Sequence, residues 1–234
     1  MRLKPILILL IFSQSLSAQK PVILSDFIQE THINDQKLYY YLDPTCVADP
    51  AHMFLGVMDM DFQELDFSRP DSALLNVRSG TCIWFRIYFE NKSTRQYSFH
   101  LQPISYSSFG EYELYQQSRK GVITLRRSGD HLNPARKDVN IGGSNDMRIY
   151  LPPDESDTLY LKVTLTDDSV ISDLTFNIST HESILKKDHS KRLLFGIFFG
   201  IMLIMILYHI PLFVKGRENS YLYYILYILS LIHI

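Results

Sequence analysis

The chain has 234 residues, 46% of them hydrophobic, and a formal net charge of −2, which excludes a disordered or a strongly basic protein. The charge is unevenly divided. Residues 19–185 carry 15 Lys and Arg against 23 Asp and Glu, a net of −8, and the rest of the chain carries the balancing +6. An acidic segment of this size does not suit nucleic acid, so we expect no nucleic-acid partner.

The N-terminus has the pattern of a secretory signal peptide. Met1–Lys4 is short and basic, Pro5–Phe12 is apolar but too short to span a membrane, and Ser13–Ala18 is polar and rich in small residues. We therefore expect residues 1–18 to direct the domain that follows them across a membrane.

Residues 24–180 form the soluble part and are predicted to be one mainly β domain. Short runs of alternating apolar and polar residues are separated by turn residues, and no long amphipathic helix interrupts them. Alternation of this kind is typical of sheets with one buried face, which predicts a jelly-roll-like β-sandwich. The clearest expected strands are residues 82–90, 97–101, 112–116, 121–126, 147–151, 158–165 and 171–178.

The segment 53–67 is ambiguous between a short helix and an edge strand, and it is rich in acidic residues. Asp59, Asp61, Glu64 and Asp66 could bind Ca²⁺ or act as a glycosidase-like carboxylate pair. The glycine and the oxygen-ligand spacing of a calcium loop are missing, so we interpret these residues as a solvated acidic edge. No metal, cofactor or catalytic residue is predicted.

The expected strand 82–90 carries the candidate ligand site. Its apolar face is Ile83, Phe85, Ile87 and Phe89, so the opposite face presents Trp84, Arg86, Tyr88 and Glu90. An aromatic floor with a few charged groups could stack on a sugar ring and bind its hydroxyls. In the alternative, which the sequence favours, another segment covers Trp84, and Arg86 pairs with Glu90 beneath it.

Cys46 and Cys82 are the only cysteines, and both fall in the expected exported domain. An oxidising compartment would allow a disulfide between them, and closing a loop of about 36 residues would contribute on the order of 3 to 4 kcal/mol. Two free thiols are the alternative, and the sequence does not decide between them.

The remainder of the chain is predicted to enter a membrane. A basic juxtamembrane linker, 181–192, precedes the uncharged run 193–214, whose helix would rise about 33 Å and cross a bilayer core of about 30 Å. A short loop, 215–220, leads to a second apolar run, 221–234, which would reach only about 21 Å. We therefore expect the second helix to be truncated and the chain to be a fragment.

Two glycines are expected to pack helices together in the first of these spans. Gly196 and Gly200 are four residues apart, which places them on one helix face and lets a neighbouring backbone approach closely. A signalling contact that shifts on ligand binding is the alternative role for this face.

Six motifs in this sequence carry a resemblance to a known family. They are Trp84–Asn91, Tyr112–Tyr115, Thr158–Val163, Gly196–Gly200, Leu207–Tyr208 and Arg217–Tyr224. With these motifs the chain resembles the bacterial seven-transmembrane receptors with diverse intracellular signalling modules. The soluble part resembles that family's second type of extracellular domain, and the membrane part resembles the start of its seven-helix bundle. His209 departs from the Asn expected after Tyr208.

The resemblance implies a carbohydrate-binding-like jelly roll in the periplasm, anchored in the bacterial inner membrane. It further implies partners that lie outside this chain, namely the remaining transmembrane helices and a cytoplasmic signalling module. The expected ligand is a small soluble molecule or a carbohydrate, and a homodimer is left open. Two alternatives remain, a membrane-tethered carbohydrate-binding or adhesion module and an exported carbohydrate-active enzyme that uses Asp59 and Asp61.

Overall fold

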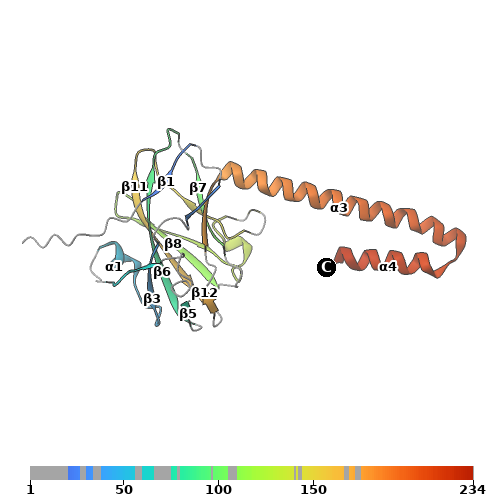
Figure 1. Cartoon of the computed structure of the whole chain (residues 1–234), viewed down its shortest axis with the longest axis horizontal. Coiled ribbons are helices and arrows are strands. Elements are labelled where there is room, and N and C mark those ends of the chain that lie inside the picture. The colour runs from blue at the N-terminus through green and yellow to red at the C-terminus, as the bar shows by residue number, and fades with distance from the viewer. Residues whose placement is uncertain are drawn as a thin grey trace, which may run out of the picture.

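The computed structural model describes residues 21–26, 30–33, 38–55, 60–65, 75–77, 80–95, 97–104, 110–139, 141, 144–165, 169–171 and 175–233. The expected signal peptide, 1–18, lies outside these residues. The described chain forms a β-rich domain from which two helices extend to one side (Figure 1).

The larger of the two main sheets is built around the long strand β6. From edge to edge its order is β4-β3-β6-β11-β8-β9, and β1 pairs in parallel with the end of β6. The other pairings in this sheet are antiparallel. Its strands are β1 (Val22–Leu24), β3 (Leu38–Asp43), β4 (Gln63–Leu65), β6 (Cys82–Asn91), β8 (Glu111–Gln117), β9 (Ile123–Ser128) and β11 (Ser156–Thr164).

The second sheet is antiparallel and carries the strand that leads toward the membrane. Its order is β10-β7-β13-β2, so β13 lies inside the sheet rather than at an edge. A separate hairpin joins β5 (Leu75–Val77) and β12 (Ser169–Ile171). The strands of the second sheet are β2 (Glu30–His32), β7 (Phe99–Ile104), β10 (Met147–Ile149) and β13 (Thr175–Thr180).

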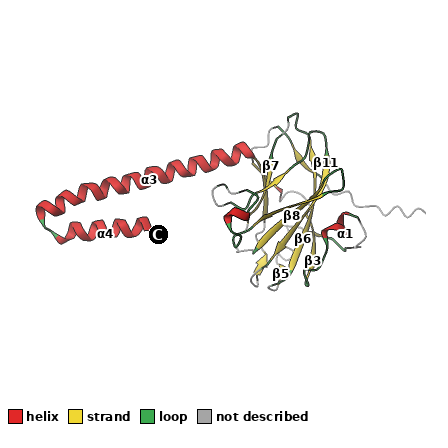
Figure 2. Cartoon of the chain, turned by 180° about the vertical axis from the view of Figure 1, so that it is seen from behind, coloured by secondary structure: helices red, strands yellow, loops and turns green. Residues whose placement is uncertain are grey.

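A continuous apolar core fills the space between the two sheets. Alternate residues of β6, which include Phe85 and Phe89, are fully buried, as the period-two pattern predicts. Phe176 of β13 meets Phe85 edge to face, with ring centroids 5.1 Å apart. The predicted mainly β sandwich, followed by apolar helices, is therefore confirmed (Figure 2).

The structure revises several predicted elements. The expected strand 171–178 is wrong in extent, because it covers parts of β12 and β13, which belong to different sheets. The ambiguous segment 53–67 contains both alternatives, since α1 (Pro50–Phe54) ends within it and β4 follows. The sequence LYYYLD of β3 was missed because its apolar residues do not alternate.

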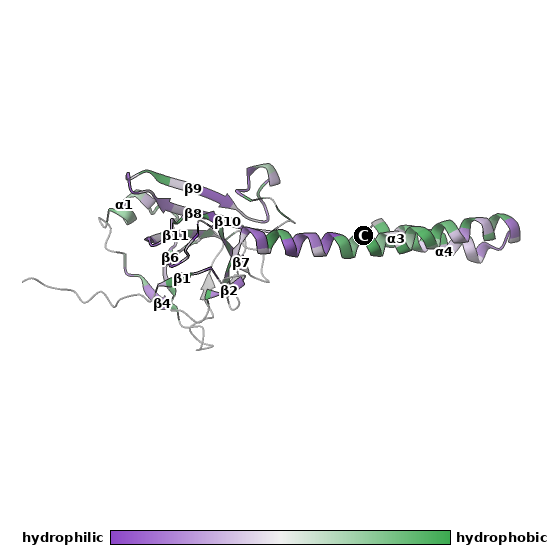
Figure 3. Cartoon of the chain, turned by 90° about the horizontal axis from the view of Figure 1, so that it is seen from above, coloured by the Kyte–Doolittle hydropathy of each residue, from purple (hydrophilic) through white to green (hydrophobic). Residues whose placement is uncertain are grey.

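Strand β13 runs directly into the long helix α3 (His181–Gly216). Residues 181–192, expected as a linker, are helical and form the first three turns of α3. These turns are hydrophilic and the rest of the helix is largely hydrophobic (Figure 3). Its 36 residues rise about 54 Å, and by length and composition α3 could cross a membrane.

Helix α4 (Asn219–His233) folds back along α3 after a tight turn. The expected loop 215–220 shrinks to Arg217 and Glu218, because Arg217 adopts a left-handed conformation that caps α3. The two helices pack through Met202 and Ile206 of α3 against Ile225 and Ile228 of α4.

Candidate functional site

The outer face of the larger sheet carries the residues that the sequence singled out. The register places Trp84 beside Tyr41 of β3 and Lys162 of β11, and it places Arg86 beside Tyr39 and Tyr160. Tyr160 in turn lies beside Tyr115 of β8. Five aromatic residues from four strands therefore share this face with Arg86 and Lys162.

Trp84 is fully buried at the centre of this face. Its ring packs 5.4 Å from Tyr115, and the ammonium group of Lys162 lies 5.6 Å from its centroid. The indole Nε1 is buried without a hydrogen-bond partner among the described residues. Trp84 therefore presents no open ring face, because another segment covers it; the Arg86–Glu90 pair expected beneath that segment stays a prediction.

The covering segment, which we call the cap, comprises residues 44–55 and 60–62 of the described chain. Met53 on α1 is buried against the Trp84 cluster, and Phe54 meets Tyr160 edge to face at 4.9 Å. Phe62 adds contacts to Tyr41 and Tyr160 at 6.0 and 6.1 Å. The cap thus gives this part of the sheet a second, smaller core.

A disulfide between Cys46 and Cys82 fastens the cap to the start of β6. The adjacent turn is organised by Asp43, whose carboxylate accepts hydrogen bonds from the backbone N–H groups of Thr45 and Ala48. Burial alone would raise the pKa of Asp43, but the hydrogen bonds from Ala48 and Thr45 outweigh it and lower the pKa. The cap is therefore held by a covalent bond, a polar turn and apolar packing.

Arg86, Tyr88 and Glu90 lie along β6 away from the cap's disulfide. The guanidinium carbon of Arg86 lies 4.8 Å from the Phe62 ring centroid and 5.2 Å from that of Tyr39. Glu90 forms an ion pair with Lys92 at 3.4 Å, and Tyr88 is half-buried. A ligand role for Arg86, Tyr88 and Glu90 stays a prediction.

The acidic segment is only partly described. Asp59 and Asp66 lie outside the described residues, whereas Asp61 and Glu64 are exposed. Within the described ranges, no group of three or more His, Cys, Asp or Glu side chains could hold a metal ion. No carboxylate-pair geometry can therefore be assigned to these residues.

Polar contacts fasten the first turns of α3 to the second sheet. Thr180, the last residue of β13, caps α3 by accepting a hydrogen bond from the Ser183 N–H at 3.4 Å. Glu30 of β2 accepts from the Asn177 side chain at 3.0 Å and pairs with Lys187 at 3.1 Å. The Glu30 carboxylate thereby connects β2 to the first turns of α3, although the two elements are far apart in sequence.

Two histidines stack at the same junction. His100 of β7 is fully buried, and its Nε2 lies 3.2 Å from Nδ1 of His181, the first residue of α3. Burial lowers the pKa of His100 from 6.5 to about 4, with His181 and Arg148 adding to the effect and Asp138 opposing it. Sequence reasoning missed this pair, because 81 residues separate its members.

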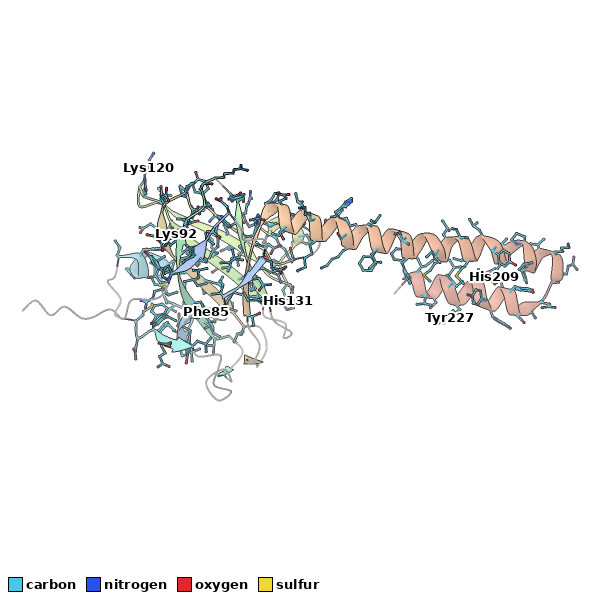
Figure 4. All side chains as sticks on the ribbon, turned by 45° about the horizontal axis from the view of Figure 1, so that its top comes forward. Phe85, Lys92, Lys120, His131, His209 and Tyr227 are labelled. Atoms are coloured by element: carbon cyan, nitrogen blue, oxygen red, sulfur yellow. A yellow bond between two sulfur atoms is a disulfide. The ribbon has the colours of Figure 1, made fainter. Side chains whose placement is uncertain are left out.

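The helix hairpin leaves the expected glycine face without a described neighbour. A Cβ added at Gly196 or Gly200 would meet no atom within 4 Å, so the role of these glycines in helix packing stays a prediction. His209 instead faces the second helix, with its ring 4.4 Å from that of Tyr224 (Figure 4).

Comparison with protein families gives two matches that divide the chain at the junction. The family described as 7TMR-DISM extracellular 2 matches residues 35–176, and the family described as 7TM diverse intracellular signalling matches residues 191–234. These are receptor-type families and not catalytic ones. No curated protein sequence matches the chain.

Two solved structures show a weak likeness to the chain. The first, from work on the promiscuous specificity of carbohydrate-binding modules of the β-sandwich superfamily, is 10% identical over 44% of this chain and 42% of that chain, with a TM-score of 0.26. The second, the GH31 α-xylosidase of Xanthomonas citri, is 11% identical over 62% of this chain and 16% of that chain, with a TM-score of 0.29. The matches span less than half of either structure, and at these scores they carry no argument.

The first prediction concerns the disulfide and the cap. Replacing both cysteines, as Cys46→Ala/Cys82→Ala, should lower the free energy of unfolding by on the order of 3 to 4 kcal/mol, because the unfolded chain regains the entropy of a loop spanning 36 residues. Trp84 is the only tryptophan, so its fluorescence reports on the sandwich in the whole chain in detergent. Acrylamide should quench it more strongly in the variant.

Reduction of the wild-type chain breaks the disulfide without removing the sulfur atoms, so it serves as the control. The reduced wild type should show the same stability and acrylamide quenching as the double variant. If Trp84 is quenched equally in the oxidised, reduced and double-variant chains, the disulfide does not hold the cap in place.

The second prediction is a pH dependence from His100. The folded chain keeps this ring neutral down to about pH 4, whereas the unfolded chain protonates it below 6.5. The resulting stabilisation is therefore fully present above pH 6.5 and is lost as the pH falls toward 4, on the order of 3 kcal/mol. The measurement is the free energy of unfolding from Trp84 fluorescence across that range.

The variant His100→Gln isolates this contribution from other groups that titrate in the same range. Burial raises the pKa of Asp146 and of Asp157, which acts in the opposite direction and remains in the variant. The stability of the variant should fall less between pH 6.5 and 4 than that of the wild type. Parallel curves would contradict the assignment.

Proposed function

This chain belongs to the 7TMR-DISM family, and we propose that it is a receptor whose extracytoplasmic sandwich senses a ligand and passes the signal into the membrane. The family match identifies the chain as a membrane protein. Its N-terminal domain is extracytoplasmic, and its 7TM region lies in the lipid bilayer. What we propose beyond the family match is that the sandwich binds a ligand and transfers a signal to the membrane helices.

The observation that carries the proposal is the direct passage from β13 into α3. β13 is flanked on both sides by hydrogen-bonded strands, so it moves with its sheet. Since Thr180 both ends β13 and caps α3, no flexible residue separates the sensing domain from the membrane helix. A change in the sandwich on ligand binding would therefore displace or rotate α3.

The ligand class, the compartment and the route of the signal are inferred from the family. We infer a carbohydrate or other small soluble ligand, a periplasmic position for the sandwich and a bacterial inner membrane around α3 and α4. The proposed signal continues through further transmembrane helices to a cytoplasmic module, neither of which lies in these residues. Residues 1–18 are proposed to act as the export signal.

The third prediction tests signal transfer through the junction. The chain is placed in lipid nanodiscs with an environment-sensitive fluorophore on Ser190→Cys, an exposed position on α3. Addition of a mixed pool of neutral and acidic oligosaccharides should change the emission. Insertion of four glycines between Thr180 and His181 should abolish the change while binding, measured as thermal stabilisation through Trp84, persists.

Two results would contradict the receptor proposal. Binding without any change at Ser190→Cys would indicate a membrane-tethered binding or adhesion module. An unchanged response in the glycine-insertion chain would show that α3 does not receive the signal through β13.

A further inference from the structure

One side of the sandwich is bordered by β9 and β10, which are edge strands of the two sheets. The register places Thr124, Arg126 and Ser128 of β9 on the same side of the sheet as Leu114 of the core. The side of β9 that faces the sandwich interior is therefore polar, and β9 is hydrophilic along most of its length (Figure 3). Near Thr124 and Arg126, which are not buried, the core does not close this side of the sheet.

Two adjoining hollows occupy this space. One of about 960 Å³ is lined by the ends of β8, β9 and β11 and by the loops 118–121 and 150–155. The other, of about 510 Å³, is lined by Tyr97, Ser98, Asp138 and Arg148. Arg126 and Tyr150 line both hollows, which therefore meet at these two side chains, and we call the two hollows together the groove.

A buried polar network forms the floor of the groove. Gln116, only 7% exposed, donates from its amide nitrogen to the Tyr150 carbonyl and, at 3.1 Å, to Asp157. Its amide oxygen accepts from Arg126 at 3.3 Å and from the Tyr150 N–H at 3.3 Å. All four positions on the Gln116 amide are thus used, which fixes the side chains of Arg126 and Asp157 toward the groove.

Fixed charges at the centre of the groove are balanced. Asp138 accepts from Arg148 at 3.3 Å and lies 4.0 Å from Arg126, and these three side chains are fixed relative to one another. The lining of the whole groove includes four basic and four acidic side chains. Such a surface offers paired donors and acceptors without a net field, which favours a neutral ligand rich in hydroxyl groups over an anion.

An aromatic ring completes the arrangement. Tyr150 is 59% exposed although it follows directly on β10, and its backbone is held at both polar atoms by Gln116. An exposed ring on a fixed backbone, beside charged hydrogen-bonding groups, suits the apolar face of a sugar ring. Trp84, by contrast, is covered by the cap.

The inner end of the groove reaches the start of α3. The carbonyl of Ser98 accepts a hydrogen bond from the backbone N–H of His181 at 3.1 Å. Arg148 lies beside His100 in the pairing of β10 with β7, and His100 stacks on His181. A ligand that shifts Tyr97, Ser98 or Arg148 would therefore act on the first residue of the membrane helix.

We propose that the groove between β9 and β10 is the receptor's ligand site, that it takes a neutral oligosaccharide, and that Arg126 and Tyr150 are its central contacts. This inference rests on the proposed receptor function, whose ligand class it places in the structure. It moves the site from the outer face of β6 to the side of the sandwich that borders α3.

The fourth prediction compares matched substitutions in the whole chain in nanodiscs. The probes are cellohexaose and maltohexaose, with hexagalacturonate as an anionic counterpart, and binding is measured by calorimetry. At least one neutral hexasaccharide should bind more tightly than hexagalacturonate. Tyr150→Ala and Arg126→Met should each weaken that binding about tenfold, whereas Tyr88→Ala on the outer face should change it less than about twofold. Unfolding followed by Trp84 fluorescence verifies that each variant is folded.

Three results would overturn the assignment. These are no binding of either neutral hexasaccharide, equal or tighter binding of hexagalacturonate, and loss of binding in Tyr88→Ala but not in Tyr150→Ala. The Ser190→Cys fluorophore separates this inference from the proposed function. If a sugar changes the fluorophore emission and Tyr150→Ala still binds that sugar normally, the groove is not the ligand site, but the receptor function stands. If a sugar binds in the groove without changing the emission, the site stands, but the receptor function does not.

Discussion

The structure depends on one shared residue at the boundary between strand and helix. Thr180 ends β13, which is paired on both sides, and its hydroxyl caps the helix that enters the membrane. The entropy of a flexible linker is absent, so the orientation of α3 follows from the sheet. The ion pair of Glu30 with Lys187 and the stack of His100 on His181 add side-chain contacts to this backbone connection. The sandwich and the membrane helix are thus mechanically one unit.

The same sheet arrangement decides where a ligand can bind. The inner face of the larger sheet is filled by the core, and much of its outer face is filled by the cap, which the disulfide and Asp43 hold in place. The aromatic residues around Trp84 therefore stabilise the domain. A groove remains beside Thr124 and Arg126, where the inward face of β9 is polar, and it borders the strand-to-helix junction.

Sequence periodicity predicted the sandwich because burial of one face imposes alternation, as in β6 and β11. Periodicity failed to predict strands that are buried on both faces or are very short. β3 is buried on both faces by core and cap, and the three-residue strands are too short to show a period. Alternation along residues 82–90 identified the face that carries Trp84, but only the tertiary fold could show that α1 covers it. Arg126 was predicted in a strand without a role, because the open space beneath it depends on the position of β10.

The central claim is that sandwich and membrane helix move as one body, and a distance measurement tests it most directly. Nitroxide labels on Glu111→Cys, an exposed position on β8, and Ser190→Cys on α3 can be compared by pulsed electron resonance in nanodiscs. The account predicts a single narrow distance distribution, which broadens when four glycines are inserted after Thr180. A distribution as broad without the insertion as with it would contradict the account.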